Sequence, residues 1–256
     1  MTQNVLFVVA GQVALITLNR PQKLNAVTPE MTDAIVTAVQ QCNASDEIRC
    51  VIITGAGEKS FCAGSDVHEL DRYDSAWQFR RRFDYCDAVR RLLKPSICAV
   101  NGYAFGGGLE LAMSCDIRIA SANARFAAPE IRLGWIGGGG MAMHLAHSIG
   151  MSNAALMLMT GDPIDADRAL AWGLVSEVVP GGRLLERARQ IAATVATRAP
   201  IAAETAKSNL KAAHSMSPDE AIEHERELQA ICFATEDARE GRAAFKEKRE
   251  PVFRRR

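Results

Sequence analysis

Short, continuously apolar segments, each with a glycine close behind, constrain the fold of this chain most strongly. Cys50-Val51-Ile52-Ile53-Thr54 and Ile97-Cys98-Ala99-Val100 are two such segments, and Ile117-Arg118-Ile119-Ala120 is a third candidate. Helix-forming stretches flank them, so we expect strands that are buried on both faces, as in parallel sheets. Strands and helices alternate in this way from residue 1 to about residue 180, which predicts an α/β fold.

The N-terminal segment has the pattern of a hairpin followed by a helix. Val5–Val9 and Val13–Leu18 are β-rich runs around a short turn at Gly11-Gln12. Thr28 is expected to cap a helix that begins at Pro29. Apolar residues then recur at i, i+4, i+8 and i+11, which predicts that one face of this helix is packed: Met31, Ile35, Val39 and Cys42.

From residue 183 onward the pattern becomes purely helical. Pro200 and Pro218 mark boundaries between helical stretches. Ser217-Pro218-Asp219-Glu220 is a capping box with proline at the first helical position. We therefore expect a core of residues 1–182 and a C-terminal helical appendage of residues 183–256. Its apolar positions exceed what a modest appendage can bury alone, which predicts self-association: Leu184, Leu185, Ile191, Val195, Ile201, Leu210, Ile222, Leu228 and Ile231.

Composition excludes several classes of partner. The 256 residues include 30 Lys and Arg against 30 Asp and Glu, so no overall field draws the chain onto nucleic acid or an anionic membrane. The seven cysteines are odd in number and scattered, which indicates small buried side chains in a reducing cytosol. No signal-peptide pattern and no apolar stretch of about 20 residues occurs, so we expect a cytoplasmic protein.

Three short motifs resemble known binding sites, but each lacks a feature that such a site requires. Gly55–Ser60 lacks the glycine that a phosphate loop needs before Lys-Ser, because Glu58 stands there. Gly137–Ala142 matches G-x-G-x-x-A, but no proper strand precedes it. His144 and His147 stand three residues apart without a third ligand in sight, so no metal site is expected.

Two glycine-bearing loops after apolar strands, together with two glutamates, are more informative. The segment 99–112 runs from a strand through Gly106-Gly107-Gly108 into a helix whose first turn contains Glu110. Free amides at such a helix start can hold a negatively charged oxygen. The loop 61–67 offers a second amide before a helix, and Glu130 follows Pro129. Two amides suit an oxyanion site, and two carboxyl groups can divide acid and base duties.

These residues and several further motifs identify the chain as similar to a known family. The chain resembles the enoyl-CoA hydratase/isomerase family, also called the crotonase superfamily, because several long motifs of that family occur in the same order. The resemblance covers essentially the whole chain and rests on these segments: Leu18–Pro21 with Asn25-Ala26, Phe61–Asp66, Ala99–Glu110, Cys115-Asp116-Ile117, Phe126–Glu130, Gly134, Gly173-Leu174-Val175 and Phe245–Arg249.

The resemblance implies a fold and a set of site residues. The fold would be a crotonase-like spiral of ββα units with a C-terminal helical region that builds trimers, often paired into hexamers. The amides of Ser65 and Gly107 would form the oxyanion hole, with Glu110 as the base toward water and Glu130 as the acid. Residues expected to contact substrate or CoA are Ala26, Ala63, Ser65, Asp66, Val67, His68, Gly107 and Lys248.

The implied activity is that of an enoyl-CoA hydratase, a hydro-lyase of the kind used in fatty-acid β-oxidation. Coenzyme A would be part of the substrate, with no separate cofactor. A positional isomerase, which usually manages with one carboxylate, is the nearest alternative, and a ring-cleaving or hydrolytic CoA-thioester enzyme is another. A non-catalytic CoA-binding protein or an RNA-binding protein is a further alternative, the latter because the resemblance includes relatives that bind RNA. Zero net charge argues against general nucleic-acid affinity, although Arg80–Arg82 with Arg90 and Arg91 leave a local basic patch.

The chain departs from the family pattern at two positions. Gly137 stands where the family usually has proline, which predicts a more mobile loop. His68 replaces a frequent lysine, which weakens the expected phosphate contact. Between the motifs, the segment 70–93 is rich in arginine and aromatic residues and would border the acyl group. We expect its arginines to be solvated or ion-paired.

Overall fold

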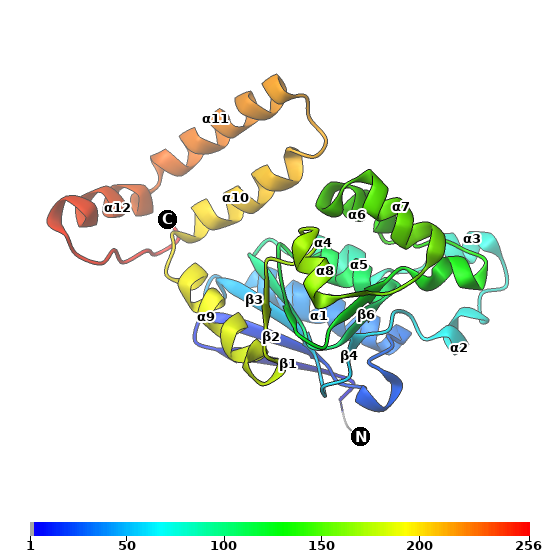
Figure 1. Cartoon of the computed structure of the whole chain (residues 1–256). Helices are drawn as coiled ribbons and strands as arrows, with labels where there is room; N and C mark the ends of the chain where they lie inside the picture. The colour runs from blue at the N-terminus through cyan, green and yellow to red at the C-terminus, as the bar shows by residue number, and fades with distance from the viewer. Residues whose placement is uncertain (1–2) are drawn as a thin grey trace.

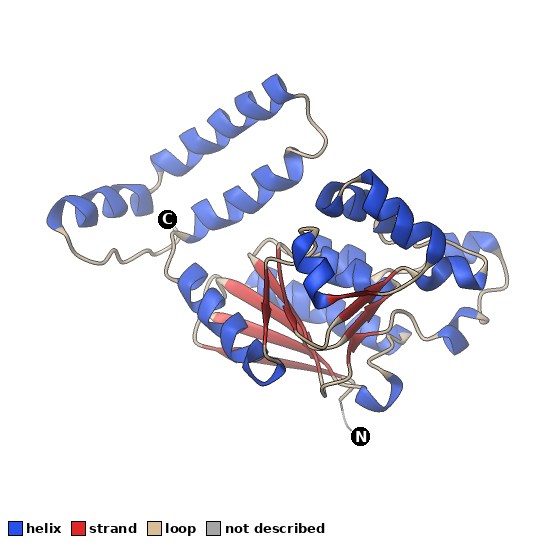
Figure 2. Cartoon of the chain, viewed as in Figure 1, coloured by secondary structure: helices blue, strands red, loops and turns tan. Residues whose placement is uncertain are grey.

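The computed structural model describes residues 3–256 as a mixed α/β structure built on two sheets (Figure 1, Figure 2). The larger sheet has the strand order β1-β2-β3-β5-β7-β10 and the smaller one the order β4-β6-β8-β9. The larger sheet consists of β1 (Val5–Ala10), β2 (Val13–Leu18), β3 (Cys50–Gly55), β5 (Ser96–Val100), β7 (Ile117–Ser121) and β10 (Glu177–Val179). The smaller sheet consists of β4 (Ser60–Cys62), β6 (Tyr103–Phe105), β8 (Arg125–Ala127) and β9 (Ile164–Asp165).

The chain winds between the sheets as a spiral. Each turn contributes one strand to each sheet, because β3 is followed by β4, β5 by β6, and β7 by β8. Within each sheet these successive strands are parallel. The opening β1–β2 hairpin is antiparallel, with Val5 opposite Leu18. The predicted hairpin, the three predicted strands and the α/β class are therefore confirmed.

Helices connect and cover the sheets. In the first two thirds of the chain they are α1 (Pro29–Ala44), α2 (Val67–Leu70), α3 (Ala76–Arg80), α4 (Tyr85–Arg90), α5 (Gly107–Met113), α6 (Met141–Ile149), α7 (Met151–Thr160) and α8 (Ala166–Ala171). The last third contains α9 (Leu184–Ala196), α10 (Pro200–Ala212), α11 (Pro218–Ala234) and α12 (Glu236–Glu247). Short 3-10 helices are η1 (Pro21–Lys23), η2 (Pro129–Leu133) and η3 (Gly181–Arg183).

Helix α1 begins and packs as its sequence predicts. Thr28 Oγ1 accepts a hydrogen bond from Met31 N at 3.4 Å, and Pro29 occupies the first position of the helix. The predicted apolar face, from Met31 to Cys42, is buried in the main core. All seven cysteines are free thiols and six are buried, in agreement with their expected role as small apolar side chains.

Both faces of the larger sheet are covered, and one of them by α9. Val51 and Ile53 face the main core, whereas Cys50 and Ile52 pack against Leu184 and other residues of α9. Because its apolar stripe completes a core, α9 is not part of an appendage. The expectation that residues 183–256 form an appendage needs this correction, and the projecting arm begins with α10.

Buried ion pairs attach α10 to the body of the molecule. Lys207 Nζ lies 2.8 Å from Asp116 Oδ2 and donates to the carbonyl of Lys94 at 2.9 Å. Lys94 Nζ in turn lies 3.0 Å from Glu204 Oε1. Beyond α10 the arm projects away from both sheets (Figure 1). Its helix α11 begins with the predicted capping box and has no buried residue.

One asparagine ties together the loops that support the smaller sheet. Asn25 is fully buried, and its Nδ2 donates to the carbonyls of Ser60 at 2.7 Å and Ala56 at 3.0 Å. Its Oδ1 accepts from Arg20 N at 2.9 Å. Removal of this side chain leaves the Ala56 carbonyl and the Arg20 N–H without these partners, whereas the Ser60 carbonyl keeps a hydrogen bond from Asn101 Nδ2 at 3.2 Å. Backbone groups that lose their partners in this way are costly.

We therefore expect Asn25→Ala to lower the free energy of unfolding by about 2 to 4 kcal/mol, measured by urea denaturation. Asn153→Ala is the matched control, because Asn153 makes a single hydrogen bond to the Ile149 carbonyl of its own chain segment. Its cost should stay below about 1 kcal/mol. Equal effects of the two substitutions would contradict the bridging role of Asn25.

Candidate active site

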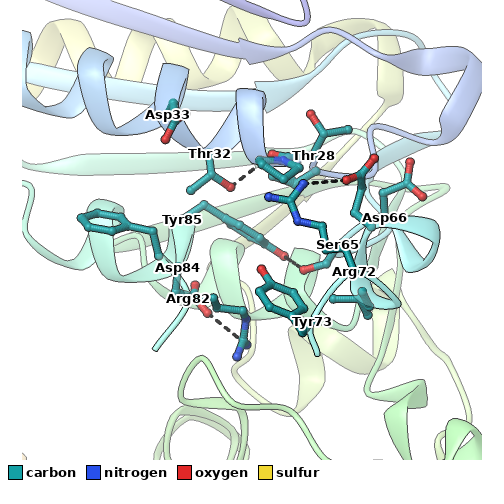
Figure 3. A pocket seen from close by; sticks show the side chains of 15 residues that line it. Thr28, Thr32, Asp33, Ser65, Asp66, Arg72, Tyr73, Arg82, Asp84 and Tyr85 are labelled. Carbon is teal, nitrogen blue, oxygen red and sulfur yellow. Dashed lines mark hydrogen bonds and ion pairs between the residues drawn. The ribbon is translucent and has the colours of Figure 1, made fainter. Parts of the chain in front are cut away.

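A cleft with two adjoining cavities opens beside the smaller sheet. The larger cavity measures about 320 Å³ and the smaller about 160 Å³. Five residues line both cavities: Ser65 from the loop after β4, Leu70 from α2, and Arg82, Asp84 and Tyr85 from the segment around the start of α4. Figure 3 shows the larger cavity, where Tyr85 and Ser65 meet at its centre.

Two backbone loops converge at this cleft because β4 and β6 are neighbours in the smaller sheet. A β-carbon placed on Gly64 would lie 3.1 Å from Gly107 N, so the two loops are in contact. Val27 N donates to the Gly64 carbonyl and Asp66 N donates to the Val27 carbonyl, which leaves the N–H of Ser65 outside this pairing. Gly107 begins α5, so its N–H has no partner within the helix.

Glu110 lies in the first turn of α5 and is buried at the cleft. Its Oε1 accepts hydrogen bonds from Gly139 N at 2.7 Å and Met141 N at 3.3 Å. Burial raises the pKa of this carboxyl to about 7, and the negative charges of Glu130 and Asp84 act in the same direction. The carboxyl group is therefore held in one position and titrates near neutral pH.

Glu130 reaches the same space from another part of the chain. Its helix η2 follows β8, which pairs with β6 so that Ala127 is opposite Phe105, immediately before α5. Burial raises the pKa of Glu130. Among residues 3–256 its buried Oε2 has no hydrogen-bond partner. An unpaired buried carboxylate oxygen is costly, and a bound ligand is the natural partner for it.

The loop before α6 is packed against Glu110. A β-carbon on Gly137 would lie 2.7 Å from Glu110 Oε1, and one on Gly139 would lie 2.6 Å from Glu110 Oε2. Glycine at position 137 therefore lets the backbone approach the carboxylate, where a proline ring would meet it. Close packing of the loop against Glu110 is the structural feature that glycine permits at this position.

The structure brings only some of the predicted CoA-contacting residues to the cleft. Ala63 and Val67 line the smaller cavity, Asp66 lines the larger one, and Ser65 lines both. The carboxylate of Asp66 also receives a hydrogen bond from Arg20 at 2.7 Å, which lowers its pKa. This ion pair anchors the loop at the start of α2.

Three predicted contacts are not brought to either cavity within one chain. Ala26 precedes the cavity-lining Val27, and its carbonyl accepts from Arg20. His68 lies in the first turn of α2 without facing either cavity. Lys248 ends α12, on the opposite side of the molecule from α2 (Figure 1). Because the helical arm leads away from the cleft, Lys248 lines neither cavity of its own chain.

Sequence reasoning missed the residues that enter the cleft from the start of α4. Tyr85 is buried, and its hydroxyl lies 3.4 Å from Ser65 Oγ. Arg82 pairs with Asp84 at 3.5 Å and stacks on the ring of Phe79 at 4.0 Å, consistent with the ion-paired state expected for an arginine here. The arginine-rich and aromatic composition of segment 70–93 was the available signal.

Two other features singled out in the sequence lie at the start of α6 and along it. Gly137–Ala142 follows the 3-10 helix η2 rather than a strand. His144 and His147 lie on α6, and the described residues contain no group of three or more side chains suited to a metal ion. Within residues 3–256, no helix has the length and apolar character to cross a bilayer.

The sequence is similar to known proteins over nearly the whole length of the chain. The sequence model of the family described as enoyl-CoA hydratase/isomerase matches residues 9–256. A short-chain-enoyl-CoA hydratase of Clostridium acetobutylicum is 40% identical over 251 residues, which cover 96% of this chain and 95% of that protein. An (E)-benzylidenesuccinyl-CoA hydratase of Thauera aromatica is 37% identical over 96% of this chain and 97% of that protein.

Solved structures agree with the fold. The crystal structure of an enoyl-CoA hydratase from Bacillus anthracis matches with a TM-score of 0.92 at 34% identity, covering 99% of this chain and 100% of that one. An enoyl-CoA hydratase structure from Mycobacterium tuberculosis matches with a TM-score of 0.92 at 31% identity, with 99% of both chains covered. The crotonase-like architecture expected from the sequence motifs is thereby confirmed.

The proximity of the two carboxyl groups can be tested by NMR titration of protein with ¹³C-labelled glutamate side chains. Glu110 should titrate near pH 7, and in Glu130→Gln its pKa should fall, because the neighbouring negative charge that disfavours its ionised form is gone. Glu240, whose pKa is held at about 2 by hydrogen bonds from Arg249, is the internal control and should not move. An unchanged Glu110 pKa would show that the two groups do not face each other.

Proposed function

The chain belongs to the enoyl-CoA hydratase/isomerase family, and from this premise we propose that it adds water across the double bond of a 2-enoyl-CoA to give a 3-hydroxyacyl-CoA. The observation that carries the proposal is the pairing of a buried carboxyl group, Glu110, with a half-buried one, Glu130, beside two converging backbone amides. Two carboxyl groups are what hydration requires, since one proton is removed from water and another is delivered to carbon.

The amides of Ser65 and Gly107 are assigned to the thioester carbonyl oxygen. Attack of water at C3 moves electrons through the conjugated system and builds enolate charge on this oxygen. Fixed amides directed at the oxygen stabilise that charge by several kcal/mol in order of magnitude. The supporting observations are the contact between the two loops at Gly64 and the position of Gly107 at the start of α5.

The two glutamates have separate roles in this proposal. Glu110, held by the amides of Gly139 and Met141, accepts the proton of the attacking water as the water oxygen bonds to C3. Glu130 delivers a proton to C2, and burial raises its pKa above the ordinary value. The net change is the addition of one water molecule, so the chemistry needs no redox or metal cofactor.

The two cavities divide the substrate between them. We assign the CoA moiety to the larger cavity, which Val27, Ser65 and Asp66 line. The acyl end then enters the smaller cavity, where Leu133, Trp135 and Ile136 supply apolar surface beside Glu110 and Glu130. Coenzyme A thus enters as part of the substrate.

The direct test follows the absorbance of the conjugated enoyl thioester with crotonyl-CoA and longer 2-enoyl-CoAs. Loss of this absorbance on addition of enzyme is the expected result. If no chain length is hydrated while the double bond of a 3-enoyl-CoA is shifted, the protein is an isomerase and the hydratase proposal fails.

We expect Glu110→Gln and Glu130→Gln each to lower kcat by at least about 100-fold, the usual scale of general acid–base catalysis. Affinity for the CoA product should stay nearly constant, because neither carboxylate is assigned to the nucleotide. The double variant should be much less active than wild type but far from multiplicatively worse than either single one, since the two groups act as a unit. If one substitution leaves hydration intact and the other abolishes activity, one carboxylate suffices and the isomerase becomes the better assignment.

We also propose that the helical arm serves self-association into a trimer or hexamer. Large apolar side chains remain exposed along it, among them Leu210, Ile222, Ile231 and Phe233.

Sedimentation velocity at micromolar concentration should accordingly give a species of three or six chains. Replacement of both Ile222 and Ile231 by Glu should shift the distribution toward single chains, because charges cannot be buried unpaired in an apolar interface. The matched control is the double substitution of Glu223 and Glu227 by Gln on the same helix. A single wild-type species at the chain mass of 27.8 kDa would overturn the proposal.

A further inference from the structure

Tyr85 has an unusual position for a buried tyrosine. It is the first residue of α4, and only 5% of the residue is exposed, yet it lines both cavities of the cleft. Asp84 caps this helix by accepting a hydrogen bond from Cys86 N at 2.8 Å, which fixes the start of the helix at Tyr85. Figure 3 shows the ring extending across the cleft toward Ser65.

The hydroxyl of Tyr85 lies against both residues that are assigned to the thioester oxygen. Its oxygen is 3.4 Å from Ser65 Oγ. It is also only 2.1 Å from the place where a β-carbon on Gly107 would lie, so it occupies the space that a side chain at position 107 would take. Ser65 and Gly107 come from different loops, and the hydroxyl lies where these loops meet.

This hydroxyl lacks a good hydrogen bond of its own. A separation of 3.4 Å from Ser65 Oγ is long compared with the usual 2.7–2.8 Å of an O–H···O hydrogen bond. A buried hydroxyl without a strong partner is costly, so this one is poised for an acceptor that the free protein does not supply. Burial raises the pKa of Tyr85 well above its usual value, and the group therefore remains an O–H donor at neutral pH.

We propose that the Tyr85 hydroxyl donates a third hydrogen bond to the thioester carbonyl oxygen, beside the amides of Ser65 and Gly107. This inference rests on the proposed function, because it assumes a thioester bound between the two loops. The contribution grows as enolate charge develops on the oxygen, since a fixed donor stabilises a charged acceptor more than a neutral one. Tyr85 is then a catalytic residue, and position 107 must be glycine to admit its hydroxyl.

Two other roles make different predictions. If Tyr85 only fills the core, Tyr85→Phe keeps the ring and hydration activity should not change. If its hydroxyl only orients the Ser65 hydroxyl, then Ser65→Ala removes the same effect while it keeps the backbone amide. In that case Tyr85→Phe should cost nothing further in a Ser65→Ala background. The proposed donor role requires the same loss from Tyr85→Phe in both backgrounds.

The first measurement is hydration of crotonyl-CoA by wild type, Tyr85→Phe, Ser65→Ala and the double variant. We expect Tyr85→Phe to lower kcat by about 10- to 100-fold, a little less than removal of one main oxyanion donor. KM should change by less than about threefold, because the donor acts mainly on the transition state. Tyr103→Phe is the matched control with activity near that of wild type, since Tyr103 stacks on Phe105 outside both cavities.

The second measurement is difference infrared spectroscopy of butyryl-CoA labelled with ¹³C at its carbonyl, a saturated thioester that cannot be hydrated. Hydrogen bonds polarise the carbonyl and lower its stretching frequency. We expect a smaller lowering in Tyr85→Phe than in wild type, and no difference in Tyr103→Phe.

An unchanged kcat or an unchanged carbonyl frequency in Tyr85→Phe overturns the inference. So does a loss that disappears in the Ser65→Ala background. Failure of the proposed function looks different: wild type hydrates no enoyl-CoA, although the carbonyl frequency of bound butyryl-CoA still depends on Tyr85.

Discussion

The close contact between the loops at Gly64 and Gly107 is the constraint on which the rest of the cleft depends. It is possible because β4 and β6 are adjacent parallel strands, so their ends lie side by side. The same spiral places β8 next to β6, which brings Glu130 to the start of α5 and hence to Glu110. The four groups assigned to catalysis, which come from three separate segments, thus meet through strand adjacency rather than through individual side-chain contacts.

Burial at the cleft makes its carboxyl groups chemically useful and thermodynamically costly. The pKa of Glu110 rises from its ordinary 4.5 to about 7 mainly through desolvation, although two backbone hydrogen bonds oppose the rise. A folded-state pKa above the unfolded value means that the native carboxyl holds its proton more tightly. Stability is therefore lost as pH rises from about 4.5 to 7, by about 3 kcal/mol in order of magnitude for this group. The large buried core offsets that cost.

The longer elements could be predicted from the sequence, whereas the short ones could not. Strands β3 and β5 have enough consecutive apolar residues to be recognised, and α1 has both a cap and a full apolar stripe. The smaller sheet was not predicted, because β4, β6 and β8 have only three residues each and a period of two cannot be read over three positions. The position of α9 was difficult to predict for a different reason. Its periodicity indicates an apolar face, but does not indicate that this face covers the sheet.

The same distinction applies to the candidate site, where some residues carried a local sequence signal and others did not. The two glutamates and the two amide-bearing loops carried local signals: a helix start, a glycine-rich turn and a proline before Glu130. The hydroxyl of Tyr85 had none, because its distance from Ser65 depends on how α4 packs against α5. Contacts of this kind are fixed by tertiary packing, and no spacing within one segment reports them.

The two ends of the cleft differ in how strongly substitutions can change them. At the carbonyl end, the groups assigned to the substrate oxygen are largely backbone amides, which point substitutions do not remove. At the acyl end, the smaller cavity is lined by the side chains of Leu133, Trp135 and Ile136, which are exposed and make few demands on the core. Changes in these side chains alter the shape of the acyl cavity without disturbing the amides or the glutamates. Under the proposed function, the shape of this cavity can therefore vary while the amides and the glutamates stay the same.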